Sequence, residues 1–397
     1  MKKVLSLDIK YSGIQILYFG SFAALMGFAS VYLLSKGFSN SMIGIALASV
    51  SAIAVFTQPT VAAFADKNQH IELRKIVAAL LVVISLLSAS VLILGKGSII
   101  LLCAFVGIAT LLTTLTPLLN SMAFVFEKYG IEINFGLGRG LGSAAYALIS
   151  FLLGYLVEDF GVNILPMVYL TMNILMIFIV YTFVVPKTEQ KEMDEEVKEE
   201  VKEQLSFIGF CKKYKKFMIF VLGLVFVYFI HTIINNFLIQ IVTNVGGSES
   251  DMGTAVFIAA ILELPAMLFF NTLREKVKCA TLIRFAVIMF LVKHVLTYLA
   301  GNVFMLYVAQ ACQMAGFAIL TPAGVYYVNE TIHRNDAVKG QSMVTMAYTA
   351  SGIIANLVGG ILLDAIGVHQ VLFCGIITSI IGAVIVFIGV DNKKVTE

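Results

Sequence analysis

Hydrophobic residues fill the chain in long runs that short polar stretches separate. A helix rises about 1.5 Å per residue, so about 20 apolar residues cross a hydrocarbon layer of about 30 Å. Twelve runs come close to this length and predict twelve transmembrane helices. The predicted spans are 11–34, 41–64, 76–94, 99–126, 138–156, 164–185, 217–242, 251–271, 281–300, 303–327, 340–365 and 371–390.

Composition supports an all-α membrane protein. Of 397 residues, 59% are hydrophobic and only 13% are charged, which excludes an ordinary soluble globule. The first apolar run is long and has no small-residue cleavage site, so we expect no cleavable signal peptide. The five cysteines fall in predicted spans or on one side of the membrane, which argues against a disulfide framework. No zinc spacing, P-loop or dinucleotide fingerprint is present, so we expect no cofactor, no metal and no nucleic-acid partner.

Basic residues are distributed unequally between the two sides of the predicted ladder. Of the 27 Lys and Arg residues, 22 lie on the side that holds both termini, and the opposite loops hold only Lys36 and Lys96. Cytoplasmic loops carry the Lys/Arg excess in membrane proteins. We therefore expect a multi-pass protein of the cytoplasmic (inner or plasma) membrane, with both termini in the cytoplasm.

The sequence repeats itself with an offset of 206 positions. Pro59 then coincides with Pro265, and the segment 154–161 coincides with 360–367. Both segments read G-x-L-x-acid-x-[F/I]-G, and each lies at the outer end of a predicted span. An offset of six spans keeps the orientation, so the pattern predicts two parallel-repeat halves of six helices each.

The repeat predicts the domain organisation. We expect a first half at 1–186, a charged cytoplasmic linker at 187–214 and a second half at 215–397. The linker run KEMDEEVKEEVKEQ can form a solvated helix with charge pairs of mixed sign. It serves either as a plain connection or as a regulatory segment.

The loop after the second span adds motif information. It carries Asp66-Lys67 and then Arg74-Lys75, in an arrangement that resembles the loop signature of the major facilitator superfamily. Ala62 stands where that signature usually has a glycine, and the gap before the basic pair is longer. The resemblance implies a conformational gate that pins neighbouring helix ends; the alternative is an ordinary positive-inside loop.

A narrower resemblance is to the lactose permease-like oligosaccharide:proton symporters and their nucleoside-carrier relatives. Arg139 takes the position of that group's arginine at the sugar site. Glu263, in the run Leu-Glu-Leu-Pro, takes the position of the substrate-coupled carboxylate, and Lys293 falls where an arginine is common. The resemblance implies solute contact by Arg139 and ion coupling by Glu263 and Lys293.

The chain also departs from that group. Lactose permease has a His and a Glu in its tenth span, where this chain has Gln313 and Gly316. Ala123 occupies the position of the sugar-binding carboxylate in the fourth span. These departures argue against lactose as the solute and against that particular proton relay.

Glu263 and Lys293 are charged residues deep in neighbouring spans. A charge in the bilayer costs several kcal/mol, so it faces the protein interior and needs a partner. Each residue lies about 12 positions, or ~18 Å, from the start of its span, and antiparallel neighbours bring them to similar depths. We expect an ion pair, which serves either proton coupling or the fixing of the two helices.

Arg139 begins the fifth span. A guanidinium at this depth either recognises vicinal hydroxyls or a carboxylate in a planar, bidentate way, or extends to the cytoplasmic interface as an anchor.

Uncharged polar residues line one face of several spans. They provide either interhelical hydrogen bonds or a polar cavity between the halves. The candidate solute-binding residues, with Arg139, are Asn120, His231, Asn235, Asn236, Gln240, Gln310, Gln313 and Asn356.

The predicted architecture and the resemblance lead us to expect a secondary active transporter that works by alternating access. The first choice is proton-coupled symport of a sugar, oligosaccharide or nucleoside by a monomer, with a proton or another monovalent cation and membrane lipid as its other partners. The alternative is a proton-coupled exporter of drugs or metabolites. A membrane-embedded enzyme would need clustered His, Asp or Glu at one interface, and a nutrient sensor would need a long signalling tail; the sequence offers neither.

Overall fold

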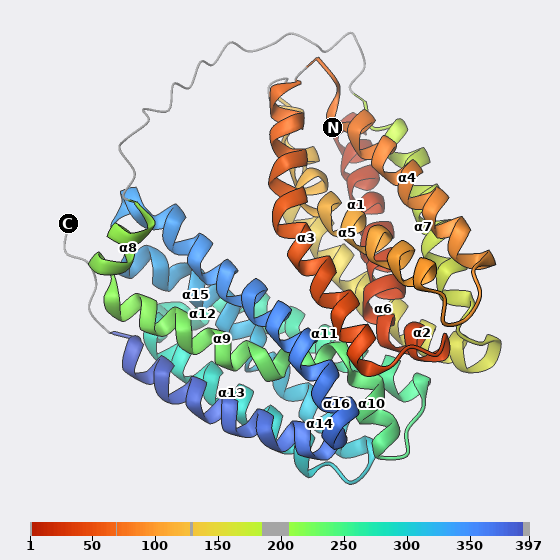
Figure 1. Cartoon of the computed structure of the whole chain (residues 1–397). Helices are drawn as coiled ribbons and strands as arrows, with labels where there is room; N and C mark the ends of the chain where they lie inside the picture. Colours follow the sequence, from red (N-terminus) through yellow and green to blue (C-terminus); the bar gives the residue numbers. More distant parts are fainter. Residues whose placement is uncertain (1, 69, 128–129, 185–205, 392–397) are drawn as a thin grey trace. The chain divides into compact units, whose positions relative to one another are not determined.

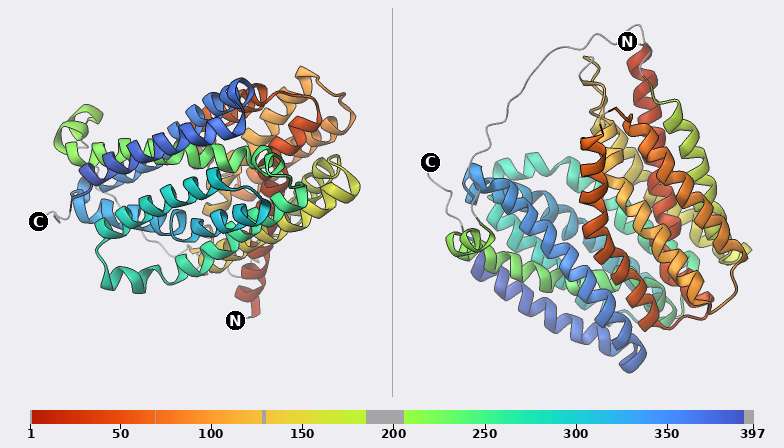
Figure 2. Two further views of the ribbon diagram at one scale, coloured as in Figure 1. Left: turned by 90° about the horizontal axis from the view of Figure 1, so that it is seen from below. Right: turned by 45° about the horizontal axis from the view of Figure 1, so that its top comes forward.

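The computed structural model describes residues 2–68, 70–127, 130–184 and 206–391. All regular secondary structure in these residues is helical. The chain divides into two compact units, Met1–Lys198 and Glu199–Glu397. Figure 1 colours the first unit red to yellow and the second green to blue, and Figure 2 shows that each is a bundle of helices running alongside one another.

The first unit is built from long apolar helices. Its first span bends by 45° where a π-helical turn separates two helices. The helix α1 packs on α6 and α7, α3 packs on α5, and α4 packs on both α5 and α7. The elements are α1 (Lys2–Phe22), η1 (Ala23–Gly27), α2 (Ala29–Ser35), α3 (Asn40–Lys67), α4 (Leu73–Ile93), α5 (Ile99–Met122), α6 (Phe135–Phe160) and α7 (Ile164–Tyr181).

The second unit repeats this scheme. The helix α9 packs on α16, α11 packs on α14, and α13 packs on α14, α15 and α16. Several of its spans are broken into two helices. The elements are α8 (Phe207–Lys213), α9 (Lys215–Asn236), α10 (Leu238–Asn244), α11 (Glu249–Leu268), α12 (Phe270–Lys276), α13 (Cys279–Leu299), α14 (Val303–Ala311), η4 (Cys312–Met314), α15 (Phe317–Thr331), η5 (Arg334–Asp336) and α16 (Ala337–Gly389).

The helices are long enough to span a membrane. Among the described residues, ten helices pass by length and hydropathy, or eleven if the bent pair in the first span counts as one. The helix α16 has 53 residues, or ~80 Å, far more than one crossing needs. It contains non-helical Gly367 and therefore covers the last two predicted spans. Each span predicted from the sequence falls mainly on helix among the described residues, and the all-helical, multi-span prediction is confirmed.

One backbone feature recurs in both units at the predicted repeat. Gly161 ends α6 with φ 80° and ψ 165°. Gly367, 206 positions later, has φ 78° and ψ 172°. Residues with a Cβ atom rarely adopt this positive-φ backbone conformation, whereas glycine reaches it without a steric clash. The repeated motif therefore ends two corresponding spans with the same turn.

The two units obtain close helix packing with glycines at different places. In the first unit, a Cβ at Gly20 of α1 would lie 2.7 Å from the sulfur of Met172. In the second unit the position that follows Gly20 by 206 residues is Phe226, and the small residue is Gly382 of α16. A Cβ at Gly382 would lie 2.9 Å from the backbone nitrogen of Val227. Each contact thus needs one glycine, on one helix or on the other.

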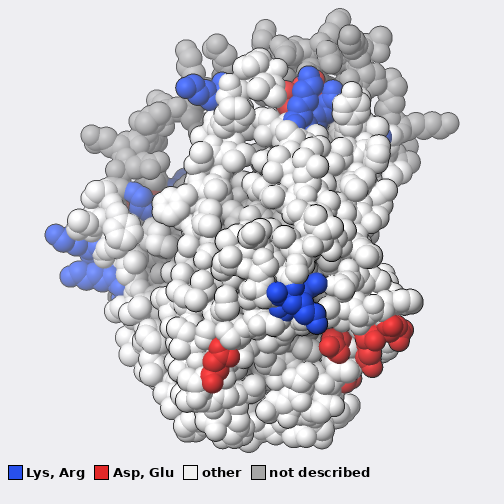
Figure 3. Space-filling model, turned by 45° about the vertical axis from the view of Figure 1, so that its right-hand side comes forward, with Lys and Arg blue, Asp and Glu red and all other residues white. Residues whose placement is uncertain are grey.

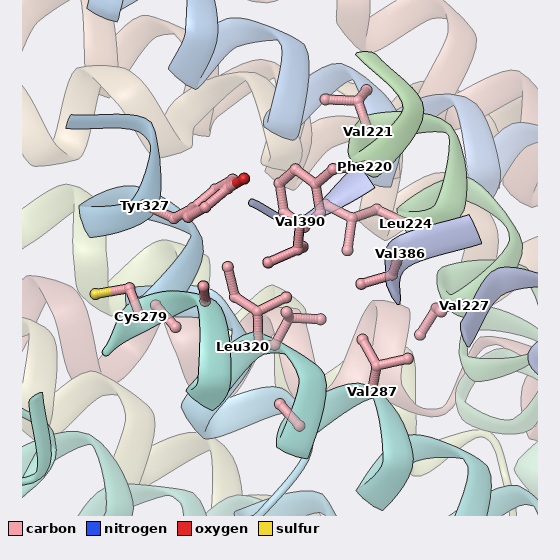
Figure 4. Close-up of a cluster of buried hydrophobic side chains, with 14 of the residues drawn as sticks. Phe220, Val221, Leu224, Val227, Cys279, Val287, Leu320, Tyr327, Val386 and Val390 are labelled. Atoms are coloured by element: carbon pink, nitrogen blue, oxygen red, sulfur yellow. The ribbon is translucent and has the colours of Figure 1, made fainter. Parts of the chain in front are cut away.

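A continuous apolar core fills part of the second unit. Figure 4 shows side chains from α9, α13, α15 and α16 meeting in it, with Phe220, Leu320 and Val386 among them. Outward-facing positions also carry many large apolar side chains, as lipid requires. The face in Figure 3 is mostly free of charge, with Lys, Arg, Asp and Glu gathered at a few places.

The predicted linker is only partly described. Residues 187–205, which include the charged run, lie outside the described residues. The remainder forms α8, whose start is capped by Ser206 Oγ accepting from the backbone nitrogen of Gly209 at 3.1 Å.

Candidate functional site

Glu263, Gln313 and Lys293 form a hydrogen-bonded chain inside the second unit. Lys293 of α13 is fully buried, and its Nζ donates to Oε1 of Gln313. Nε2 of Gln313 donates to Oε1 of Glu263, on α11, at 2.5 Å. The expected direct ion pair is therefore wrong in detail, because the Gln313 amide lies between the two charges. Glu263 and Lys293 nevertheless lie close enough in depth for both to bind the side-chain amide of Gln313.

Gln313 reaches this position because the tenth span is interrupted. The α-helix α14 ends at Ala311, a 3-10 segment follows, and Gly316 has φ −90° and ψ −83° before α15 starts. Short 3-10 stretches within a helix often mark a hinge or local strain. Pro322 lies well inside α15, so the break itself is not a proline kink. Periodicity alone did not reveal this interruption.

His231 occupies an aromatic environment next to the hydrogen-bonded chain Glu263–Gln313–Lys293. It is 1% exposed on α9, and its ring stacks on Phe317 at 5.5 Å between centroids. Phe290 meets the same ring edge-on at 4.9 Å. Nε2 of His231 is 3.1 Å from Nδ2 of Asn235, whereas Nδ1 has no hydrogen-bond partner among the described residues. Nδ1 is thus a buried polar atom whose hydrogen-bonding capacity is not satisfied by the described residues.

The other candidate amides of the second unit are also interior. Asn236 donates from Nδ2 to Oδ1 of Asn356 at 2.7 Å, which joins α9 to α16. Gln240 of α10 and Gln310 of α14 are both buried. The Asn236–Asn356 bond is the kind of interhelical contact that stabilises membrane bundles, so it explains these two residues without a solute.

Arg139 lies near the start of α6 in the first unit. Its guanidinium carbon is 4.1 Å from the centroid of the Phe19 ring, and Nη1 is buried without a hydrogen-bond partner among the described residues. An arginine held on an aromatic face keeps its planar donors ordered. Asn120 is half-buried near the end of α5, in the same unit.

The predicted gate motif has a different acidic partner from the one expected. Asp66 and Lys67 are exposed at the end of α3, and Asp66 makes no ion pair among the described residues. Instead Glu72, at the N-cap of α4, pairs with Arg74 at 2.6 Å and with Lys75 at 2.9 Å. Hydrogen bonds from these two side chains lower the pKa of Glu72 to about 2. Sequence reasoning missed Glu72, although its place just before the basic pair was a usable signal.

Arg74 also connects two helix ends. Its Nη1 donates to the backbone oxygen of Tyr181, at the end of α7, at 2.6 Å. Its guanidinium carbon lies 5.7 Å from the centroid of the Tyr181 ring. Arg74 therefore joins the start of α4 to the end of α7.

A second ion-pair cluster lies in the connection between α15 and α16. The carboxylate of Asp336 accepts from Lys213 Nζ at 2.9 Å and from Tyr214 Oη at 2.8 Å. Burial raises the pKa of Asp336, but the hydrogen bonds from Lys213 and Tyr214 outweigh it and leave the pKa lowered. The cluster ties η5 to α8 and the start of α9. Among the described residues, no group of three or more His, Cys, Asp or Glu is arranged to hold a metal ion.

Comparisons with known proteins agree with this architecture. Residues 8–374 match the MFS_1 like family. No curated protein matches the sequence. Among solved structures, the D323A mutant of nucleoside transporter NupG is similar with a TM-score of 0.81 and 13% identity, covering 97% of this chain and 100% of that one.

Two further structures share the fold. Nucleoside transporter NupG gives a TM-score of 0.76 at 15% identity, with 98% of each chain covered. A bacterial homolog of the human lysosomal transporter Spinster, in an inward-facing and unoccupied conformation, gives 0.67 at 14% identity, covering 97% of this chain and 96% of that one. The match to the family covers most of the sequence. The chain therefore belongs to the MFS_1 like family and is a multi-pass secondary transporter of a small solute, with the major facilitator fold, and not an enzyme.

Proposed function

We propose that this transporter is a proton-coupled symporter of a sugar, oligosaccharide or nucleoside that works by alternating access. The observation that carries the proposal is the chain Glu263–Gln313–Lys293 in the interior of the second unit. Buried ionisable groups within membrane spans are rare and costly, and they mark ion pathways and proton relays. A carboxylate in such a chain can accept a proton, and the fixed cation of Lys293 can favour its release.

Polar groups in both units are the proposed solute contacts. Arg139, with its unpartnered Nη1 and the Phe19 ring beneath it, suits planar recognition of adjacent hydroxyls. In the second unit, His231 offers an unpartnered ring nitrogen within an aromatic setting that suits a sugar or base face. The remaining proposed contacts are Asn120, Asn235, Gln240 and Gln310, whereas Asn236 and Asn356 bind each other and Gln313 connects Glu263 with Lys293. Nucleosides are the first solutes to test, because two similar structures are those of a nucleoside transporter.

The orientation follows from the charge distribution. We assign the side rich in Lys and Arg to the cytoplasm, which puts both termini there, in the inner or plasma membrane. The halves are assigned to 1–186 and 215–397, joined by a cytoplasmic linker at 187–214. Asp66, Lys67, Arg74 and Lys75 are assigned to a conformational gate, and the chain is assigned to a monomer.

The proposal is tested with purified protein in proteoliposomes. Uptake of a panel of sugars and nucleosides is measured with and without an imposed pH gradient, for the parent and for Glu263→Gln. The parent should concentrate one solute when the interior is alkaline, and Glu263→Gln should only equilibrate it. A parent that equilibrates a solute but never concentrates it contradicts symport. Solute accumulation when the interior is acidic, with protons leaving as solute enters, would support proton antiport and therefore the exporter instead.

A further inference from the structure

We infer that Gln313 is a positioning residue that links the protonation of Glu263 to the bend of the tenth span. The inference rests on the proposed symport and assigns this residue a role other than solute contact. Gln313 lies in the non-α-helical interval between α14 and α15, and its side chain is the only connection that the described residues provide between Glu263 and Lys293 by hydrogen bonds. Three spans therefore meet through one amide at a backbone break.

The orientation of that amide is fixed by chemistry. The ammonium of Lys293 can only donate hydrogen bonds, so it must face the carbonyl oxygen of Gln313. The NH₂ group is then directed at Glu263 and donates to it. The NH₂ group of Gln313 needs an acceptor here, and the charged carboxylate of Glu263 accepts a stronger hydrogen bond than a neutral group would.

Protonation of Glu263 weakens this arrangement. A hydrogen bond to a charged acceptor is about twice as strong as one between neutral groups. When a proton binds the Glu263 carboxylate, the carboxylate loses its charge. The hydrogen bond from Gln313 to Glu263 then becomes weaker. Gln313 gives up no proton in this step, because an amide does not titrate in this range. The proton that binds Glu263 is therefore not supplied by Gln313.

The surroundings contain few other titratable groups. Tyr348 of α16 interacts electrostatically with Glu263, and Cys312, His231 and His294 interact with Lys293. With Lys293 itself, these are the titratable side chains among the described residues that interact with Glu263 or Lys293. Among these five, only Lys293 donates a hydrogen bond to Gln313.

The backbone next to Gln313 allows motion. Gly316 separates η4 from α15, and a Cβ built on it would meet Phe290 no closer than 3.4 Å, which is ordinary contact. Alanine therefore fits sterically at this position while favouring a continuous helix. The break is a property of the local sequence that Gly316→Ala can remove without a clash.

The first test measures coupling. Under an imposed gradient of one pH unit, Gln313→Leu should exchange solute across the membrane but lose accumulation, so that its accumulation ratio falls to about one. The isosteric Gln313→Glu should lose accumulation as well, because it removes the donor to Glu263 while keeping the side-chain volume. Ser379→Ala is the control: it removes a buried hydrogen bond to His294 at 2.9 Å, in the same unit, and should accumulate solute like the parent.

The second test needs no solute. Cys312 adjoins Gln313 and is half-buried, so its alkylation by N-ethylmaleimide at pH 7 reports on the break. In a background lacking the other four cysteines, Glu263→Gln mimics the protonated state and should change the labelling rate at least threefold. Gln313→Leu should change it in the same direction, Gly316→Ala in the opposite direction, and Ser379→Ala not at all.

The outcomes separate the two proposals. If the parent does not accumulate any solute, symport is contradicted, whatever the variants do. If the parent accumulates solute and both Gln313 variants do so equally well, symport stands and the role of Gln313 is wrong. Equal labelling of Cys312 in the parent, Glu263→Gln and Gln313→Leu also overturns it, even if no transported solute has been found.

Discussion

The two units share a packing scheme but differ in chemistry at one corresponding contact. In the second unit, Lys293 of α13 donates to Gln313. The residues 206 positions earlier are Leu87 of α4 and Gly107 of α5. A Cβ built on Gly107 would lie 3.8 Å from Cδ1 of Leu87, so the same two positions are neighbours in the first unit too. The repeat thus keeps the contact and replaces a leucine and a glycine with an amine and an amide.

The third member of the hydrogen-bonded chain has a different partner in the first unit. Glu263 corresponds to Thr57, whose Oγ1 lies 2.9 Å from that of Thr114. The first unit thus folds with neutral residues at the three corresponding positions. This difference agrees with the proposed function, in which the charged residues of the second unit serve coupling.

The largest effect is expected when the second unit is given the residues of the first. The triple variant Glu263→Thr, Gln313→Gly, Lys293→Leu removes every charge together, so no unpaired ion stays buried. It should fold and exchange solute but accumulate none, against about tenfold accumulation for the parent per pH unit. Accumulation ratios in proteoliposomes and the melting temperature in detergent measure both parts. A triple variant that accumulates solute like the parent would sink the comparison.

Removing the cation from the hydrogen-bonded chain Glu263–Gln313–Lys293 should destabilise the protein. Lys293→Leu leaves the half-buried Glu263 without the nearby cation. Loss of one partner from a directly bonded buried pair costs ~3–5 kcal/mol, so we expect a smaller loss here, where an amide separates the two charges. Adding Glu263→Gln to this variant should restore part of the loss, because the remaining charge is then removed. Thermal unfolding of the single and double variants gives the coupling energy. Strict additivity of the two changes would mean that the residues do not interact.

The glycine contacts offer a more moderate test. Gly382→Ala places a Cβ 2.9 Å from the backbone nitrogen of Val227, which cannot move aside alone, so we expect a loss of ~1–3 kcal/mol. Gly352→Ala in the same helix has no atom within 4 Å of its added Cβ and should be neutral or stabilising. Melting temperatures compare the two. Equal destabilisation would point to a general cost of alanine in α16 and not to the contact.

The smallest effects concern the ion pairs outside the spans. Asp336 is buried and tied to Lys213 and Tyr214, whereas the side chain of Glu72 is 50% exposed. Both have a lowered pKa in the folded protein, so each stabilises it above the unfolded pKa of about 4 and loses that effect as pH falls. For Glu72 the loss spans pH 4.5 to about 2.

Substitutions should follow the same order. Asp336→Asn should cost ~1.5–3 kcal/mol at pH 7, because it weakens hydrogen bonds to a charged, buried acceptor. Glu72→Gln should cost at most ~1 kcal/mol, and high salt should erase the difference. Unfolding measured at pH 7 and at pH 3, with and without 1 M salt, tests this order. A larger cost for Glu72→Gln than for Asp336→Asn would contradict the view that the buried pair contributes more to stability than the exposed pair.

The spans were predictable because each is an apolar run whose length the bilayer sets. The repeat was predictable because corresponding landmarks share one offset, and Gly161 and Gly367 adopt the same turn. The breaks in spans were not predictable, since an interruption such as the one at Gln313 changes backbone angles without altering hydropathy.

The candidate site was predictable in membership but not in connectivity. Glu263 and Lys293 were found because an ionisable residue in an apolar run is conspicuous. Their link through Gln313 was missed because a one-residue difference in helix phase decides which side chains touch, and sequence spacing fixes depth better than direction. Glu72 was missed for a similar reason: the search for an acid followed the motif to Asp66, and the nearest carboxylate to Arg74 lies elsewhere.

The central claim is that proton coupling depends on the carboxylate of the second unit. With the membrane potential clamped at zero, the steady-state accumulation of a neutral solute is measured at several imposed pH differences. The logarithm of the accumulation ratio should rise with a slope of about one per pH unit in the parent, for one proton per solute, and with a slope of about zero in Glu263→Gln. Equal slopes in the two proteins, or a flat line in the parent, would contradict the account.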